Sequence, residues 1–206
     1  MKSAATPFSI DMDGSSTLIL SCSARAGGNS DRASEILSGL MAQDGPISLI
    51  NMRGCKINPC LSCGSCLISK NPCPAARGDD SEALFSAILK AEKFLVVSPV
   101  YFYHLPGILK IFIDRAQYYY ALHEQGAPEL VSRPWRSAAP LLISGREKGE
   151  KLFEGGLLTL DFFMRPFHFS IGERLLLRGL DWPSALRGNR EMEKMVMDFG
   201  RLMAKL

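Results

Sequence analysis

Residues 94–100 (FLVVSPV) are the most strand-like segment of the chain and the one that most restricts its fold. The segment is nearly continuous in apolar residues and rich in valine, which is typical of a central parallel strand covered on both faces. Such a strand needs helices on both sides of its sheet. The segment therefore predicts an α/β domain with a parallel sheet at its centre.

Strand-like and helix-like segments alternate along the rest of the chain. Strands are expected at 17–21, 47–52, 138–144 and 167–170, and helices at 31–43, from 79 onward, and at 107–120, 149–164 and 190–206. This alternation predicts a flavodoxin-like, doubly wound sheet of five parallel strands. Ligands of such folds bind beyond the carboxyl ends of the strands, at the point where the strand order reverses.

Residues 1–16 have one lysine, two aspartates and no sustained apolar run, so they are expected to be a polar extension and not a signal peptide. Residues 17–206 are expected to form one domain. The sequence has no run of about 18 apolar residues, so no membrane helix is expected. The net charge is only +3, and the lysines and arginines are scattered among acidic residues, which argues against nucleic-acid binding. A cytoplasmic protein is expected, in which clustered cysteines bind metal or do redox work.

Residues 55–78 are expected to form a cysteine-rich insertion after the second strand, and four of their five cysteines are closely spaced. They are Cys60, Cys63, Cys66 and Cys73, separated by two, two and six residues. The two-residue gaps let successive thiols converge on one centre, and sulfur ligands suit an iron–sulfur cluster or zinc. Structural zinc more usually uses two separated CxxC pairs, so the spacing favours an iron–sulfur cluster. Zinc and an empty or oxidised site remain alternatives.

Residues 22–30 (CSARAGGNS) join the first expected strand to the first helix. In doubly wound folds this turn binds phosphate through backbone N–H groups, hydroxyls and the start of the helix. Ser23, Asn29 and Ser30 offer side-chain donors, Arg25 offers positive charge, and Gly28 permits close approach of the backbone. The turn lacks the G-K-S/T ending of a Walker loop and the GxGxxG of a Rossmann site. It predicts a phosphate site, although a simple capped loop would look similar.

Residues 98–115 (SPVYFYHLPGILKIFIDR) place aromatic side chains at the end of the best strand. A planar, partly apolar ring system needs such a wall, with free main-chain amides for its polar edge. The alternative is that these aromatic residues only cap the core. The later run Tyr118–Tyr120 is expected to do that, or to meet a partner subunit.

Together, the two segments resemble the NAD(P)H-dependent FMN reductase group of flavodoxin-like proteins. There the first segment commonly reads G-S-x-R-x-x-G-N-S/T, and the second S-P-V/I-Y-F/W followed by Lys and then Asp-Arg. Cys22 departs from this pattern, because it stands where the family usually has glycine. The four-cysteine segment is similar to that of the iron–sulfur flavoproteins within the group, whose cysteine motif holds a 4Fe–4S cluster.

The resemblance implies which residues would hold FMN. Ser23, Arg25, Asn29 and Ser30 would bind its phosphate beside Gly28. The isoalloxazine would be lined by Pro99, Val100, Tyr101 and Phe102, and the turn at Ser144 and Gly145 would close near its other edge.

The function expected from these features is that of an FMN-dependent redox protein. Electrons would pass between a ferredoxin-like carrier or NAD(P)H, FMN and a small acceptor by way of the four-cysteine iron–sulfur cluster. The resemblance also implies a homodimer or homotetramer. One alternative is a plain NAD(P)H-dependent FMN or quinone reductase whose cysteines bind zinc or no metal. Another, from a different class, is a metal-stabilised interaction module without redox function.

Overall fold

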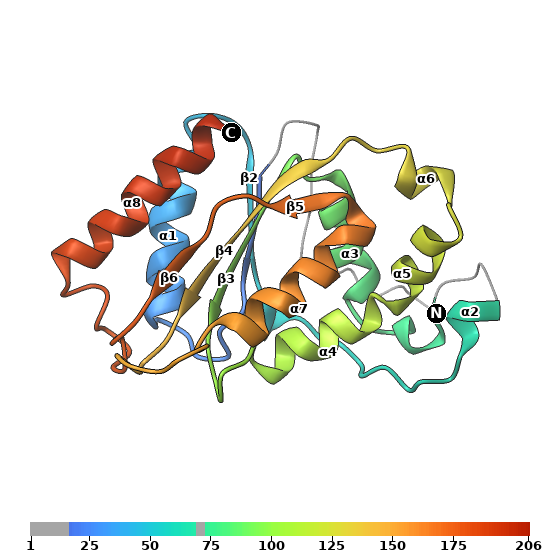
Figure 1. Cartoon of the computed structure of the whole chain (residues 1–206), viewed down its shortest axis with the longest axis horizontal. Coiled ribbons are helices and arrows are strands. Elements are labelled where there is room, and N and C mark those ends of the chain that lie inside the picture. The colour runs from blue at the N-terminus through green and yellow to red at the C-terminus, as the bar shows by residue number, and fades with distance from the viewer. Residues whose placement is uncertain (1–16, 69–72) are drawn as a thin grey trace.

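A parallel β-sheet forms the centre of the computed structural model, which describes residues 17–68 and 73–206 (Figure 1). Its strands are β1 (Thr17–Ser21), β2 (Ile47–Asn51), β3 (Lys93–Pro99), β4 (Arg136–Ile143), β5 (Phe169–Ile171) and β6 (Leu175–Leu177). The order is β2-β1-β3-β4-β5, and β6 also pairs with β4. The α/β class and the parallel sheet agree with the prediction, whereas the predicted extension at residues 1–16 lies outside the described residues.

The prediction of five strands is wrong, because the sheet has six. Both β5 and β6 pair with β4, the first opposite its start (Arg136–Ala138) and the second opposite its end (Leu141–Ile143). Between these two pairings β4 advances three residues, from Ala138 to Leu141, while the segment from β5 to β6 advances four, from Ile171 to Leu175. One extra residue therefore interrupts the ladder. The interruption falls on Gly172 and the exposed, charged Glu173 and Arg174, which cannot continue a buried strand.

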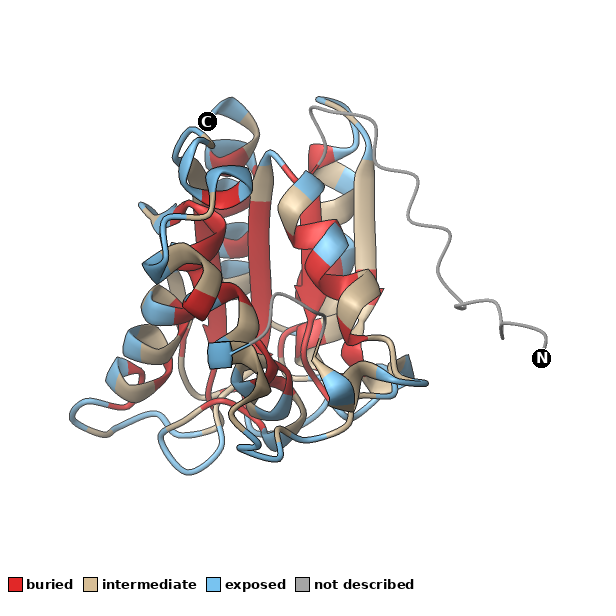
Figure 2. Ribbon diagram, turned by 90° about the vertical axis from the view of Figure 1, so that its right-hand side faces the viewer, coloured by how far each residue is buried: buried red, intermediate tan, exposed pale blue. Residues whose placement is uncertain are grey.

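Helices cover both faces of the sheet. One face packs against α1 (Asn29–Met41) and α8 (Arg190–Lys205), and the other against α3 (Ser81–Lys90), α4 (Gly107–Arg115) and α7 (Glu154–Met164). Each face has its own apolar core, as expected for a sheet buried on both sides. Figure 2 shows buried residues along the strands, with exposed residues in the loops and on the outer helix surfaces.

Shorter elements complete the chain. They are η1 (Met52–Gly54), α2 (Ser65–Ile68), η2 (Pro74–Ala76), α5 (Gln117–Glu124), α6 (Pro128–Val131) and η3 (Arg165–Phe167). The helix predicted at 107–120 is in fact two helices, α4 and α5, which meet at Ala116. In the described part of the chain, no helix combines the length and apolar composition needed to cross a membrane.

The cysteine-rich segment connects β2 to α3, as its place in the sequence predicts. Residues 69–72 of this segment lie outside the described residues. Its short helix α2 lies beside α5, at the right of Figure 1, away from the strands. Its position is therefore established, but its predicted role as a cluster-binding insertion stays a prediction.

The carboxyl ends of the parallel strands meet at the lower edge of the sheet in Figure 1. The chain moves from β1 to β2 on one side and continues through β3 on the other, so the strand order reverses between β1 and β3. This is the position at which doubly wound sheets bind their ligands.

Candidate functional site

A cavity of about 990 Å³ opens at this edge, between the loops that follow β1, β3, β4 and β6. All eleven residues predicted for the flavin site line it: Ser23, Arg25, Gly28, Asn29, Ser30, Pro99, Val100, Tyr101, Phe102, Ser144 and Gly145. The fold brings them together from three separate segments. Their role in binding a cofactor stays a prediction, but their common location is a property of the structure.

The loop after β1 is fixed by short-range hydrogen bonds. Ser23 Oγ accepts a bond from the Arg25 backbone N–H at 3.1 Å, and the partly buried carboxylate of Asp31 accepts one from Gly27 N–H at 2.7 Å. Gly27 has a φ of 69°, a left-handed conformation that suits glycine. Helix α1 begins after Gly28, which provides no side-chain cap. Its first N–H groups and its positive dipole end are therefore available to an anion.

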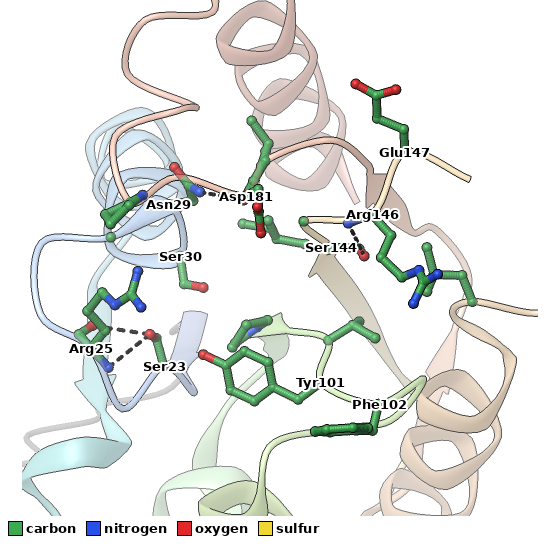
Figure 3. Close-up of a pocket in the computed structure, with 18 of the residues that line it drawn as sticks. Ser23, Arg25, Asn29, Ser30, Tyr101, Phe102, Ser144, Arg146, Glu147 and Asp181 are labelled. Atoms are coloured by element: carbon green, nitrogen blue, oxygen red, sulfur yellow. Dashed lines mark hydrogen bonds between the residues drawn. The ribbon is translucent and has the colours of Figure 1, made fainter. Parts of the chain in front are cut away.

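Arg25 extends beside Ser23 and Ser30 at one end of the cavity (Figure 3). Its side chain is exposed and makes no ion pair with any described residue. Ser23 and Ser30 are buried, so their hydroxyls lie at the floor of the site. A cation, two hydroxyls and a helix start in one place suit a phosphate group.

Asn29 performs a task that sequence reasoning did not identify. Its side-chain amide donates to the carbonyl oxygens of Leu180 at 3.0 Å and Trp182 at 2.8 Å, and it accepts from Leu186 N–H at 2.9 Å. The side chain thereby ties the start of α1 to the loop after β6. That loop brings Asp181 and Pro183 to the rim of the cavity.

The wall opposite α1 is a tight turn at the end of β3. Val100 N–H donates to Ile143 O at 2.7 Å, and Tyr101 and His104 exchange two backbone hydrogen bonds of 2.9 Å each. Phe102 and Tyr103, between them, have φ values of 49° and 63°. Positive φ at both central residues is the pattern of a type I′ turn.

The third side of the cavity is the loop after β4. Ser144 is buried, and its hydroxyl accepts a bond from Arg146 N–H at 3.1 Å. A Cβ atom at Gly145 would lie 2.5 Å from Asp181 Oδ1 and 3.1 Å from Asp181 Cα, so only glycine fits there without displacement. The two loops therefore approach each other as closely as their backbones allow.

Other residues of the rim were missed by sequence reasoning. Tyr103, Arg146, Glu147, Lys148, Leu180, Asp181 and Pro183 also line the cavity. Their neighbours in sequence could have indicated the first four, because these directly follow predicted site residues. Nothing local in the sequence marks the segment after β6, which reaches the site only through β6 and Asn29.

The residues of this cavity fit FMN. Its volume lies in the range of small-molecule sites, with a phosphate-compatible end at α1 and an aromatic wall at residues 99–102. The N–H groups at the start of α1 are available at one end, and the buried Ser144 hydroxyl lies at the other edge. The sequence-predicted set therefore has the chemistry and the arrangement that a flavin mononucleotide needs.

The four clustered cysteines line a second cavity of about 830 Å³, together with Arg115 and Tyr118. Burial, followed by the charge of the other three sulfurs, raises the pKa of the Cys66 thiol. Hydrogen bonding to Ser65, whose Oγ lies 3.3 Å away, lowers the pKa of Cys63. All four cysteines thus border one space. However, in residues 17–68 and 73–206 no group of three or more His, Cys, Asp or Glu side chains could hold a metal ion as arranged.

Arg115 forms the fixed base of this second cavity. Its guanidinium donates to Asp79 at 2.7 Å, and both side chains are fully buried. It also donates to Asn58 O at 3.0 Å and Ser81 Oγ at 3.1 Å, while its Nε has no partner among the described residues. A buried cation therefore lines the same cavity as the four cysteines.

Comparisons with known proteins agree with this geometry. The model of the family described as NADPH-dependent FMN reductase matches residues 16–151 of the 206. No protein of curated function matches the sequence.

Solved structures share the fold at low identity. A flavone reductase has a TM-score of 0.66 and 14% identity, over 92% of this chain and 62% of that one, so this chain spans less than two thirds of its length. The NAD(P)H:quinone oxidoreductase from Methanothermobacter marburgensis has a TM-score of 0.65 and 15% identity, over 93% and 94%. An FMN-dependent NADH-azoreductase from Bacillus anthracis str. Ames Ancestor, in complex with FMN, has a TM-score of 0.62 and 14% identity, over 92% and 99%.

These structural similarities show the fold, and the family match covers more than half of the chain. The resemblance read from residues 22–30 and 98–115 is therefore confirmed. The chain belongs to the NADPH-dependent FMN reductase family and is an NAD(P)H-dependent oxidoreductase.

Proposed function

We propose that the protein uses FMN, bound in the cavity at the carboxyl edge of the sheet, to pass electrons from NAD(P)H to a small acceptor such as a quinone. One observation supports this most strongly. All eleven residues predicted from the family resemblance line one cavity at the reversal of strand order. Quinone and azo acceptors also appear in the names of proteins with this fold.

In this proposal each side of the cavity has one task. Arg25, Ser23, Ser30 and the start of α1 bind the FMN phosphate. Residues 99–102 lie against the ring system, and the Ser144–Gly145 turn borders its other edge. FMN, when bound, supplies the redox chemistry by accepting a hydride and returning its electrons to an acceptor.

The side chains near the ring position the reactants, and none has to act as an acid or base. His104, the titratable residue next to the aromatic turn, has Nε2 3.2 Å from Thr159 Oγ1, which fixes its ring to α7. The protein's contribution is therefore binding, orientation and limited access of water.

The test is an anaerobic half-reaction assay on the purified protein. We expect about one FMN per chain, bleaching of the flavin band by NADPH or NADH, and its return when a quinone is added. Protein that binds FMN but is not bleached by either nicotinamide would contradict the proposed donor. Protein without affinity for FMN would contradict the proposal as a whole.

A second candidate, an iron–sulfur cluster on Cys60, Cys63, Cys66 and Cys73, is favoured by one observation. These four cysteines share one cavity with the buried cation Arg115. Sulfur-only ligands suit such a cluster, and a ferredoxin-like partner would belong to this version of the function. The plain reductase agrees better with the family match and with the lack of a metal-holding group among the described residues.

Metal analysis separates the two versions. Protein purified without air would contain about four iron atoms and four sulfides per chain if a 4Fe–4S cluster is present. One zinc per chain, or no metal, would contradict the cluster and leave the plain reductase. The interaction module without redox function is not supported, because the family is one of oxidoreductases.

We also propose a homo-oligomer in the cytoplasm. The six cysteines are all free, which suits a reducing compartment. A groove between α4, α5 and α7 exposes Tyr120, Leu158 and Phe162, an apolar surface of the kind that subunits cover. Tyr119, in contrast, is buried in the core, as expected for a capping residue. Light scattering that gives the mass of a single chain would contradict the oligomer.

A further inference from the structure

Asp31 is an acidic residue close to the place where the proposed function puts a phosphate. It is the third residue of α1 and directly follows Ser30, which is buried and lines the flavin cavity. An acid in the first turn favours the helix, because the start of a helix carries a partial positive charge. The same negative charge would repel the phosphate of FMN. One helix start therefore accommodates two groups of like charge.

The carboxylate of Asp31 has a partner at each of its oxygens. Oδ2 accepts a hydrogen bond from Gly27 N–H at 2.7 Å, and Oδ1 accepts one from Arg53 Nη1 at 2.8 Å. The Ser21 hydroxyl also donates to Oδ1, at 3.4 Å. Only 11% of the Asp31 side chain is exposed. Three segments thus hold this carboxylate: the end of β1, the loop after β1, and η1 after β2.

Arg53 neutralises the charge of Asp31. It lies in η1, directly after β2, and β2 pairs with β1 as far as Asn51 and Ser21. The sheet therefore brings the guanidinium to the carboxylate. Opposite charges 2.8 Å apart cancel each other at longer range. A phosphate at the start of α1 therefore meets a neutral pair and not a free acid.

The bond to Gly27 differs from the usual arrangement at a helix start. In a capping box, the acid at the third helical position accepts the N–H of the N-cap residue. Gly28 is the N-cap of α1, yet Asp31 accepts from the residue before it. Gly27 has a φ of 69°, a conformation that glycine adopts without strain. The bond therefore holds the left-handed residue of the loop and does not occupy the N–H of Gly28.

This bond restricts the loop that carries the predicted phosphate ligands. The loop contains two adjacent glycines, the residue type with the largest conformational freedom. Ser23 fixes the backbone at Arg25, and Asp31 fixes it at Gly27, so the loop is held on both sides of the Arg25 side chain. Figure 3 shows this side chain beside Ser23. If the loop were free, the cost of ordering it would lower the affinity for the phosphate.

We propose that Asp31, neutralised by Arg53, is a positioning residue that makes the protein select FMN over riboflavin. Neither side chain is among the described residues that line the cavity, so both act through the loop and not by contact with the flavin. This inference rests on the proposed function and adds to it a determinant of cofactor choice. Riboflavin has the same ring system and ribityl chain but no phosphate. It therefore separates an effect on the phosphate from a general effect on the fold.

The measurement is the Kd of FMN and of riboflavin, each titrated into the full chain freed of flavin and followed by flavin fluorescence. Asp31→Ala and Asp31→Asn both leave Arg53 without its partner, but only asparagine keeps an oxygen acceptor for Gly27 N–H. The Kd of FMN should therefore be about tenfold higher in Asp31→Ala than in Asp31→Asn. The Kd of riboflavin should differ between these variants by less than about twofold.

Arg53→Met tests the charge separately. It keeps the bond between Asp31 and Gly27 and leaves the carboxylate without its cation. The Kd of FMN should rise about tenfold over the wild type at low salt, and the rise should shrink at high salt because screening weakens the repulsion. The Kd of riboflavin, which has no phosphate to repel, should stay at the wild-type value.

The neighbouring residue Arg32 provides a matched control. Its ion pair with Glu193 measures 2.6 Å and its side chain is 30% exposed, compared with 2.8 Å and 27% for Arg53. This pair joins α1 to α8 and not to the loop after β1. Arg32→Met should therefore leave the ratio of the two Kd values unchanged, even where it lowers the melting temperature.

The outcomes separate the inference from the proposed function. A loss of affinity confined to FMN in Asp31→Ala and Arg53→Met supports the positioning role. Equal factors for both flavins, or no change in either, would show that the inference is wrong while the proposed function stands. If Asp31→Ala does not fold, Arg53→Met decides by the same ratio. Wild-type protein that binds neither flavin would contradict the proposed function, and the inference with it.

Discussion

The flavin cavity and the cysteine cavity differ in how the chain builds them. The first is bounded by loops that leave β1, β3, β4 and β6, so regular hydrogen-bonded strands fix its walls. The second is bounded largely by residues 60–67 and 73–75, whose regular structure in the described part is limited to the short helices α2 and η2. The eleven predicted flavin residues share one site, whereas the four thiols share a cavity without forming a metal-holding group.

This difference has a physical origin. A phosphate site made of strand ends and a helix start exists before its ligand arrives, because the sheet fixes it. A cysteine site on an irregular segment gains its geometry when the metal binds, since binding and folding of such segments are coupled. A motif in turns fixed by strands therefore predicts how its residues are arranged. A cysteine motif on an irregular segment predicts only which residues would be ligands.

The largest effect is expected where the cysteine cavity meets the core. Arg115→Met leaves the fully buried Asp79 without its cation, which should lower the free energy of unfolding by about 3–5 kcal/mol. Urea unfolding followed by circular dichroism measures this. The exposed Arg201, paired with Asp198 at 2.8 Å, provides the control Arg201→Met, expected to cost less than about 1 kcal/mol. Equal losses in Arg115→Met and Arg201→Met would contradict the view that the buried Arg115–Asp79 pair is a fixed base for the cysteine cavity.

A second substitution tests how closely the flavin cavity is constructed. In Gly145→Ala, the new methyl group would lie 2.5 Å from Asp181 Oδ1, which should destabilise the fold by about 1–3 kcal/mol and reduce FMN retention. The matched control is Gly39→Ala at an exposed position of helix α1, where a Cβ meets nothing within 4 Å. That change should be neutral or stabilising. FMN retention unaffected by Gly145→Ala would show that the two loops need not touch.

Asn29→Ala should have a smaller effect on stability. It removes three hydrogen bonds to the loop after β6, with an expected loss of about 1–2 kcal/mol. FMN should dissociate faster, because Asp181 and Pro183 are no longer fixed at the rim. Asn29→Asp keeps the acceptor for Leu186 N–H but turns a carboxylate oxygen towards the carbonyl oxygens of Leu180 and Trp182, so its loss should be at least as large as that of Asn29→Ala. An Asp variant as stable as the wild type would contradict the two donated bonds.

The smallest expected effect is a change in how the free energy of unfolding depends on pH in acid. Burial raises the pKa of Asp79, but hydrogen bonds from Ser81, Asn58 N–H and Arg115 outweigh it, so the folded pKa lies below the usual value. The contribution of this carboxylate to the free energy of unfolding is fully present above its unfolded pKa of about 3.9. It is lost as the pH falls through the lower folded pKa. Asp79→Asn should flatten the pH dependence of unfolding below about pH 4. An unchanged slope would contradict the assignment.

Local sequence was sufficient for the parts of the molecule whose interactions are local. The strand at 94–100, the phosphate turn at 22–30 and the aromatic turn at 99–102 lie where their patterns predict. The division of the last strand depends on its register against β4, and the helix break at Ala116 depends on packing, since alanine itself favours helix. The bonds of Asn29 join residues more than 150 positions apart, which no local pattern contains.

FMN retention in matched arginine variants tests the central claim most directly. The account predicts about one FMN per chain in the wild type and in Arg187→Ala, whose arginine is exposed and lies outside the cavity. Arg25→Ala with Ser30→Ala should lose most of the flavin while its melting temperature without FMN stays unchanged. Full flavin content in that double variant would contradict the placement of the phosphate and, with it, the site described for this reductase.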